Sequence, residues 1–442
     1  MNNQVNVKID FDKVIGKIKP MHAVNNGPYP AGTDQKRGNF YDYKAARIPY
    51  ARNHDASFDS AYGGNHTVDV NFIFPDFDAD VNDPNSYDFA CTDKYVSQTY
   101  EAGTEVFYRL GSRIEHEVKK YNTIMPKDFL KWAQICEHII MHYTEGWANG
   151  FNYKMDYWEI WNEPDLDPDE ATNKRCWSGT TLEFCEFYSV AAKHLKNRFP
   201  HLKIGGPASA GDEAWLEKFL KYQSEKGVPM DFVSWHWYWT EPMDMSIKGT
   251  RIRALMKKYG YGEAESILNE WNYVRGWLDE FVYSIEQIIS IKGACFFSAC
   301  MLAGQNNPDI DMMMYYDARQ GAFNGLFDYY TRRPLKGYYS YYLFANLYDM
   351  GTQVYSESDC EDVYVVGAEG NGKKAAMITY YAENDNKWQK YITIDLGSSE
   401  FDGAKVYVVD ETRTMNEYTW SKIENGKITI FAERNSIFYI EV

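Results

Sequence analysis

The sequence lacks the features that mark several classes of protein. No stretch concentrates Lys and Arg, and 46 basic against 63 acidic residues give a net charge of −17. We therefore expect neither nucleic acid nor an anionic membrane as a partner, because both require a basic surface. The longest apolar run, around Ala294 to Gly304, falls well short of the ~20 residues that a transmembrane helix needs.

Targeting signals and cysteine motifs are also missing. The amino terminus has no basic segment followed by an apolar one, so no secretory signal is visible. The seven cysteines are odd in number and form no CxxC pair. Reduced thiols in a cytoplasmic protein are the favoured interpretation, although a secreted protein whose signal has been removed would look the same. The sequence does not exclude a homo-oligomer.

The composition that remains is typical of a soluble globular protein, with 45% apolar and 25% charged residues. The 442 residues exceed one ordinary domain, although an α/β barrel alone can take about 250 or more. As far as about Gly351, short apolar runs alternate with segments of helical periodicity. This alternation is typical of βα units around a parallel sheet.

Eight candidate strands can be counted in this part of the chain, and eight strands with helices between them favour a closed (β/α)8 TIM barrel over an open sheet. We expect the strands at 20–24, 46–52, 106–109, 157–161, 203–206, 232–236, 266–269 and 294–297.

The helices are expected from residues typical of helix starts and from their apolar faces. Pro126 suits a first helical position, ahead of a face formed by Phe129, Ala133, Cys136 and Ile140. Residues 180–183 read as a capping box for a second helix. Residues 215, 216, 219 and 220 repeat the apolar pattern in a third.

After about Gly351 the pattern changes to period-two alternation. Asn371-Gly372 and Asn425-Gly426 are hairpin turn signals, because both residue types tolerate positive φ. We expect a β-sandwich, with a further strand from residues 4–10. The predicted domains are a catalytic barrel over 13–351 and an accessory β-sandwich over 1–12 and 352–442. The expected strands lie at 363–366, 391–396, 405–409, 427–430 and 437–442.

Two glutamates follow expected strands in similar surroundings. Glu163 stands in the run Trp-Asn-Glu-Pro-Asp and Glu270 in the run Asn-Glu-Trp-Asn. A glutamate at a strand end is most often a helix cap or a surface salt-bridge partner. Here both lie in an aromatic, amide-rich frame, and the carboxyl ends of barrel strands meet at one mouth. Two facing carboxylates are what cleavage of a glycosidic bond requires.

The order of these motifs resembles the retaining glycoside hydrolases of clan A, and within them family 39, which includes β-xylosidases and α-L-iduronidases. The resemblance covers most of the chain. It rests on residues 22–28, 52–55, 161–164, 203–207, 236–238, 269–271, 325–327 and 336–339. Two positions depart from the family pattern: Asp165 stands where members often have Asn, and Asn269 where Thr or Ser is common.

The resemblance implies that Glu163 is the acid/base and Glu270 the nucleophile. A general acid working near neutrality needs a pKa raised from ~4.3 towards 6 or 7, which burial and a neighbouring carboxylate favour. Tyr238 and Arg52 are the expected donors that keep Glu270 ionised, and both are also predicted to bind substrate. Asn162 is expected to bind the sugar 2-hydroxyl.

His54 and His236 admit a metal interpretation, since an imidazole beside Asp55 has ligand chemistry. Two histidines on different strands are weak evidence, so we predict sugar or carboxylate contacts for both, with no metal and no cofactor. Most aromatic residues are expected in the core. Four tryptophans near strand ends are candidates for stacking on a sugar, and Trp271 is predicted to bind substrate. They are Trp237, Trp239, Trp271 and Trp277.

The predicted function is therefore a retaining, exo-acting β-xylosidase that releases xylose from the non-reducing end of xylo-oligosaccharides. An arabinoside, a galactoside or an α-L-iduronide is the alternative substrate within the same enzyme class. A uronate would need a cation such as Arg275 in the pocket. A barrel that binds carbohydrate without catalysis is the alternative outside that class.

Overall fold

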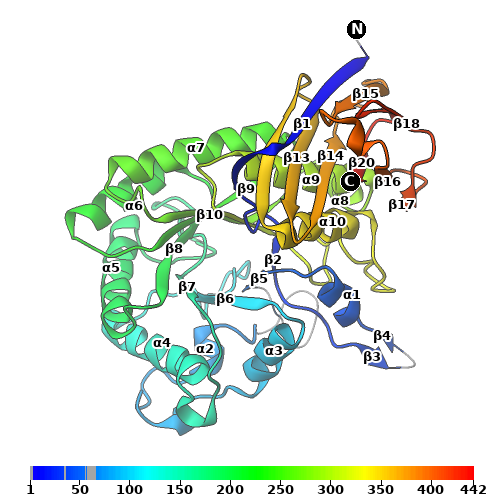
Figure 1. Cartoon of the computed structure of the whole chain (residues 1–442). Coiled ribbons are helices and arrows are strands. Elements are labelled where there is room, and N and C mark those ends of the chain that lie inside the picture. Colours follow the sequence, from blue (N-terminus) through cyan, green and yellow to red (C-terminus); the bar gives the residue numbers. More distant parts are fainter. Residues whose placement is uncertain (1–2, 34–35, 55, 57–65) are drawn as a thin grey trace.

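The computed structural model describes residues 3–33, 36–54, 56 and 66–442. Figure 1 shows a barrel with helices around it and a separate sheet against one side, next to which both chain ends lie. Eight parallel strands close the barrel in the order β2, β5, β6, β7, β8, β9, β10 and β11. A (β/α)8 barrel with an accessory β domain is confirmed.

Seven of the barrel strands coincide with predicted ones. Each apolar run is followed by a helix that covers it from outside, which is the repeat expected of βα units. The strands are Ala23–Asn25 (β2), Tyr50–Asn53 (β5), Glu105–Leu110 (β6), Tyr157–Ile160 (β7), Lys203–Ser209 (β8), Phe232–Trp239 (β9), Glu265–Tyr273 (β10) and Met312–Tyr315 (β11).

The eighth strand was predicted in the wrong place. Residues 294–297 lie inside the helix α9, Ile291–Asn306, and the strand that closes the barrel is β11. Nearly all of α9 is buried, because it lies between the barrel and the accessory sheet. A short apolar run without a polar face cannot be assigned to helix or strand by periodicity alone.

The other helices largely begin near the residues that the sequence predicted as helix starts. Thr180 and Glu183 form a capping box. Pro126 is not the first helical residue, because the side chain of Asp128 accepts from Lys131 N and caps the helix at Phe129. The helices are Phe40–Ala45 (α1), Val70–Ile73 (α2), Ala90–Glu101 (α3), Phe129–Thr144 (α4), Thr181–Arg198 (α5), Glu213–Glu225 (α6), Pro242–Lys258 (α7), Phe281–Ile288 (α8), α9 and Lys336–Met350 (α10).

The accessory sheet is built from both ends of the described chain. Its order is β17-β16-β20-β14-β13-β12-β1-β15-β19-β18, and β1 pairs with β12 on one side and β15 on the other. The strands are Gln4–Lys17 (β1), Thr352–Ser358 (β12), Val363–Gly370 (β13), Lys373–Tyr380 (β14), Lys390–Asp395 (β15), Lys405–Val409 (β16), Thr414–Glu417 (β17), Lys422–Glu424 (β18), Lys427–Ala432 (β19) and Ser436–Glu441 (β20).

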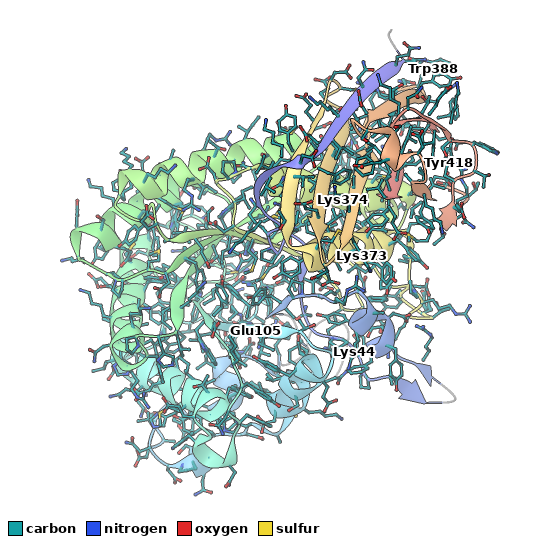
Figure 2. All side chains as sticks on the ribbon, in the orientation of Figure 1. Lys44, Glu105, Lys373, Lys374, Trp388 and Tyr418 are labelled. Carbon is teal, nitrogen blue, oxygen red and sulfur yellow. The ribbon has the colours of Figure 1, made fainter. Side chains whose placement is uncertain are left out.

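Both Asn-Gly turns occur where they were expected. Asn371 and Gly372 join β13 to β14, and Asn425 and Gly426 join β18 to β19, all four with positive φ. In Figure 2, Lys373 and Lys374 mark the end of the first turn, whereas Glu105 marks the barrel. Among the described residues, no single helix is long and apolar enough to cross a bilayer. Helices α8 and α9 reach that length only together, across an 80° bend.

Alternation along β14 explains how the sheet joins the barrel. Ala376 and Ile378 point into the core of the accessory domain, whereas Ala375 and Met377 belong to the barrel core. Helices α9 and α10 lie against the latter face. A strand that is apolar on both faces therefore connects the two cores.

Candidate active site

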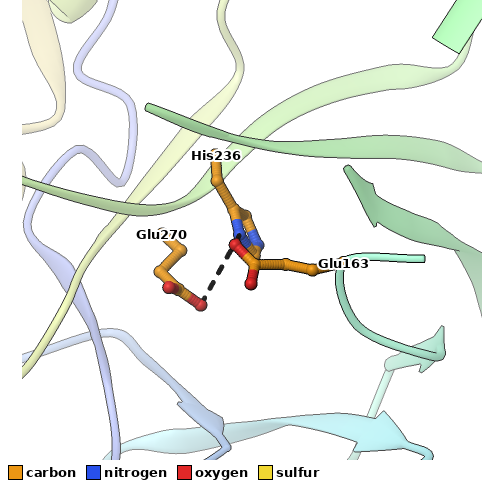
Figure 3. A group of neighbouring side chains, drawn as sticks. All are labelled: Glu163, His236 and Glu270. Atoms are coloured by element: carbon orange, nitrogen blue, oxygen red, sulfur yellow. Dashed lines mark hydrogen bonds and ion pairs between the residues drawn. The ribbon is translucent and has the colours of Figure 1, made fainter. Parts of the chain in front are cut away.

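The two predicted glutamates meet at one end of the barrel. Glu163 follows β7, and Glu270 lies in β10. The side chains are 13% and 8% exposed, so both are largely removed from solvent. Figure 3 shows the two carboxyl groups converging on the ring of His236, which comes from β9. The barrel thus brings together two residues that are far apart in the sequence.

His236 connects the two carboxylates. Its Nδ1 lies 2.8 Å from Glu163 Oε1 and 3.7 Å from Glu270 Oε2. The ligand atoms of all three side chains lie within 4.8 Å of one another. Carboxyl groups about 5 to 5.5 Å apart are typical of retaining glycosidases, whereas inverting enzymes need about 6.5 to 9.5 Å.

The imidazole of His236 suits a partner that changes its protonation state. Complete burial lowers the pKa of His236, against the opposing charge of Glu270. A neutral imidazole accepts a hydrogen bond at one nitrogen and donates one at the other. The contact with Glu163 is therefore compatible with a protonated and with an ionised carboxyl, depending on the tautomer.

Glu270 is held by donors on both of its oxygens. Tyr238 OH donates to Oε1 at 2.6 Å and Arg52 Nη1 to Oε2 at 3.1 Å, while His54 Nε2 lies 3.7 Å from Oε2. Burial and the nearby carboxyl of Glu163 raise the pKa of Glu270, and the charge of Arg52 and the Tyr238 hydrogen bond oppose that rise. Donors of this kind favour the ionised form of a buried carboxyl group.

A further buried carboxylate, Glu159, was missed from the sequence. It is 0% exposed and accepts from Arg52 Nε at 2.7 Å and from Ser234 Oγ at 2.6 Å, and Asn269 also donates to it. The available signal was a lone charge in the otherwise aromatic and aliphatic run of β7. Glu159 balances the charge of Arg52 in the barrel interior.

Arg52 and Asn162 were both predicted to touch substrate, and the structure separates their roles. Arg52 is wholly buried, with Asn25 Oδ1 and Asn162 Oδ1 as further acceptors at 3.0 and 2.6 Å. It is therefore enclosed by Glu159, Glu270 and the two amides rather than free to contact a sugar. Because Arg52 takes the amide oxygen of Asn162, the amide nitrogen is the remaining donor of that side chain.

The four tryptophans that were candidates for stacking are divided between two environments. Trp271 is 1% exposed and packs on Phe296 and Phe297 of α9. Its position on β10 points it away from Glu270, since neighbouring residues of a strand face opposite sides. The structure therefore places Trp271 in the core, which corrects the prediction that it contacts substrate.

The same alternation applies to β9, where His236 and Tyr238 face the site and Trp237 and Trp239 face outward. Trp277 is the tryptophan that lies beside the site residues. It is 57% exposed, and its ring lies 5.2 Å from that of Tyr238 and 6.1 Å from that of Phe323. These rings offer apolar faces of the kind on which a sugar stacks.

Glu163, His236 and Glu270 also meet the geometric condition for three metal ligands. His236 Nδ1 lies 2.8 Å from Glu163 Oε1, which is a hydrogen-bond distance. A zinc ion between ligands would instead lie about 2.0 to 2.1 Å from such a nitrogen. The absence of a metal stays a prediction. Asp55, which prompted the metal interpretation of His54, lies outside the described residues.

Comparison with known proteins supplies independent information. The family model for glycosyl hydrolases family 39 matches residues 5–280. Residues of this chain are 30% identical over 173 positions to a β-xylosidase of Geobacillus stearothermophilus, covering 35% of this chain and 33% of that protein. A β-xylosidase of Caldicellulosiruptor saccharolyticus is 29% identical over 187 positions, covering 40% and 36%. The chain thus spans about a third of the length of these curated relatives.

Solved structures resemble the whole chain in fold. A glucosidase from Croceicoccus marinus superposes with a TM-score of 0.79 at 22% identity, covering 100% of this chain and 99% of that one. A monomeric β-xylosidase from Caulobacter crescentus superposes with a TM-score of 0.69 at 15% identity, covering 99% of both chains. At these identities the superpositions establish the shared architecture.

Proposed function

Because the chain belongs to glycosyl hydrolases family 39, we propose that it is a retaining, exo-acting β-xylosidase that releases xylose from xylo-oligosaccharides. The observation that carries the proposal is the pair Glu163 and Glu270, which have carboxylate oxygens within 4.8 Å of each other beside His236. This separation supports a double displacement.

In the first step, a carboxylate oxygen of Glu270 attacks the anomeric carbon and forms a covalent ester. The glycosidic carbon–oxygen bond breaks, and the proton of the Glu163 carboxyl goes to the departing oxygen. Arg52 and Tyr238 stabilise the nucleophile as an anion before attack. The amide nitrogen of Asn162 is placed to bind the 2-hydroxyl, a contact that strengthens as the sugar ring gains positive charge.

In the second step, the Glu163 carboxylate removes a proton from water, whose oxygen attacks the anomeric carbon and releases Glu270. Two inversions give overall retention. His236 suits both steps, because a neutral imidazole can accept from the protonated Glu163 and donate to the ionised one.

The choice of xylose as the sugar rests on the named relatives and on the pairing of two arginines. The relatives that share sequence with this chain are named β-xylosidases. Against an iduronide, the guanidinium of Arg275 is engaged elsewhere: its Nε lies 3.0 Å from Glu280, and its Nη1 lies 4.0 Å from Glu383. Arg52 is enclosed by its partners as well. Two candidate anchors for a uronate are thus already paired.

A panel of 4-nitrophenyl glycosides tests the proposal. It comprises the β-D-xyloside, β-D-glucoside, β-D-galactoside, α-L-arabinofuranoside and α-L-iduronide. We expect the highest kcat/KM on the xyloside, and ¹H NMR should show β-xylose as the first product. Faster turnover of another sugar would replace the substrate, and α-xylose as the first product would contradict retention.

Xylobiose distinguishes the non-catalytic alternative. Binding of xylobiose by calorimetry, without hydrolysis of any glycoside over long incubation, would favour a carbohydrate-binding barrel. The hydrogen bonds that Tyr238 and Arg52 donate to Glu270 argue for turnover instead. Chromatography of xylopentaose digests should show xylose and xylotetraose, without xylobiose or xylotriose, at early times if the enzyme acts from the chain end.

A further inference from the structure

A carboxylate that the proposed mechanism does not use lies two residues after Glu163. Asp165 accepts from three donors at the end of β8 and in the loop that leads from it to α6: Ser209 Oγ and Ala210 N, both at 2.7 Å, and Asp212 N at 3.3 Å. Burial raises the pKa of Asp165 to about 6, and the bonds from Ala210 and Ser209 oppose that rise. Asp165 thus connects the segment after β7 to the neighbouring loop.

The same loop is held from another element by a buried cation. Lys248, on α7, is 2% exposed; its Nζ donates to the Gly211 carbonyl at 2.6 Å and lies 3.6 Å from Glu213. The loop amides therefore face a carboxylate, while a loop carbonyl faces an ammonium group. Hydrogen bonds to charged groups are shorter and stronger than those between neutral groups.

The last residues of β8, from which this loop continues, contact the backbone of the acid/base residue. Glu163 N donates to Ala208 O at 2.8 Å, and Ala208 N donates to Ser234 Oγ at 2.9 Å. Glu163 and Ala208 both have left-handed backbones, with φ of 47° and 55°. Side chains disfavour that conformation, so it persists only where the surroundings impose it.

We propose that Asp165 is a positioning residue for Glu163. It holds the β8–α6 loop, the loop fixes Ala208, and the Ala208 carbonyl fixes the backbone from which the Glu163 carboxyl reaches the departing oxygen. The inference rests on the proposed function in one respect, namely that Glu163 is the general acid.

The chemistry of the leaving group separates this role from a structural one. A dinitrophenolate departs without a proton, whereas a sugar hydroxyl needs one as the bond breaks. A displaced Glu163 therefore slows substrates with poor leaving groups and spares those with good ones. A general loss of folded protein lowers both rates equally.

The experiment compares Asp165→Ala with the wild type on xylobiose and on 2,4-dinitrophenyl β-D-xyloside. We expect kcat/KM to fall about 100-fold on xylobiose, within the range of general acid catalysis, and no more than about 3-fold on the activated substrate. Asp165→Asn keeps one acceptor for Ala210 N, and the Ser209 hydroxyl can reverse to accept from the amide. Its ratio of the two rates should lie between those of wild type and Asp165→Ala.

Asp212→Ala is the matched control in the same loop. The Asp212 side chain caps α6 through Ala214 N and Trp215 N and makes no bond to Asp165. It should lower the melting temperature and leave the ratio of the two rates unchanged. Should Asp165→Ala not fold, Asp165→Asn carries the comparison alone.

Equal losses on both substrates, or a ratio that Asp212→Ala changes as much, would overturn the role of Asp165. Failure of the proposed function would look different, because the wild type itself would not hydrolyse the xylosides. If the panel identifies another sugar, the same comparison is made with its dinitrophenyl glycoside and its disaccharide.

Discussion

The Nε of Arg52 donates to Oε2 of Glu159 at 2.7 Å, and both side chains are 0% exposed. The same guanidinium reaches Glu270 through Nη1, so a buried ion pair lies directly behind the candidate nucleophile. Because desolvated charges are tolerated only when they are paired, this ion pair ties the stability of the barrel interior to the electrostatics of the site.

Glu159→Gln should therefore lower both the stability of the protein and its activity. The amide cannot accept from Arg52, Ser234 and Asn269 at once, and it leaves the charge of Arg52 less balanced. We expect the free energy of unfolding to fall by about 3 to 5 kcal/mol in urea titrations. A shifted Arg52 should lower kcat/KM about 100-fold.

Glu265→Gln is the control for this change. Glu265 lies at the other end of β10, in a partly exposed pair with Lys203. Such pairs contribute about 1 kcal/mol or less. Equal effects of the two substitutions would contradict a special role for Glu159.

Glu270→Gly should abolish hydrolysis of 2,4-dinitrophenyl β-D-xyloside, because no carboxylate remains to attack the anomeric carbon. Azide fits into the space left and attacks from the same face, so it should restore turnover and yield the α-xylosyl azide. NMR of the product identifies its configuration. A β-configured azide would assign the nucleophile to another residue.

Glu163→Ala should give the opposite product. The activated xyloside still forms the ester with Glu270, and azide then replaces the water that Glu163 would have activated. The expected product is the β-xylosyl azide, with xylobiose hydrolysis reduced about 100-fold or more. Retention of full activity on xylobiose would exclude Glu163 as the general acid.

Tyr238→Phe should change the pH dependence of the reaction. The Tyr238 hydrogen bond lowers the pKa of Glu270, so its removal raises that pKa. Glu270 must be ionised to attack, and the acidic limb of kcat/KM should therefore move to higher pH by about 1 unit, given roughly 1.5 kcal/mol for a hydrogen bond to a charged group.

Tyr273→Phe, on β10, serves as the comparison for Tyr238→Phe, because the Tyr273 hydroxyl bonds to Glu383 and not to Glu270. Its acidic limb should stay in place. A limb that moves to lower pH in Tyr238→Phe would show that the hydroxyl does not stabilise the ionised nucleophile.

Because His22 is buried, we expect the folded protein to lose stability in acid. Burial lowers its pKa from 6.5 to about 3, while its Nε2 contacts Arg47 O at 3.3 Å. The unfolded chain then binds a proton that the folded chain does not, so stability is complete above about pH 6.5 and falls as the pH decreases towards 3. Urea titrations across this window should show less pH dependence for His22→Phe, and an unchanged slope would contradict the assignment.

Local patterns were sufficient for most of the fold. Period-two alternation and the two Asn-Gly turns located the accessory hairpins, because positive φ at these residues is a local property. Apolar runs located seven barrel strands. They failed at 294–297, since a helix that is buried on all sides has no polar face to reveal its period.

The sequence by itself determined which carboxylates to consider, because Glu163 and Glu270 stand in distinctive runs at strand ends. Only the tertiary structure decided their neighbours. The barrel brought Arg52 and His236 to them from two other strands, and it set Glu159 of β7 against Arg52. It also turned Trp271 outward. Such contacts depend on strand alternation and closure of the sheet, which join residues far apart in the chain and leave no local pattern.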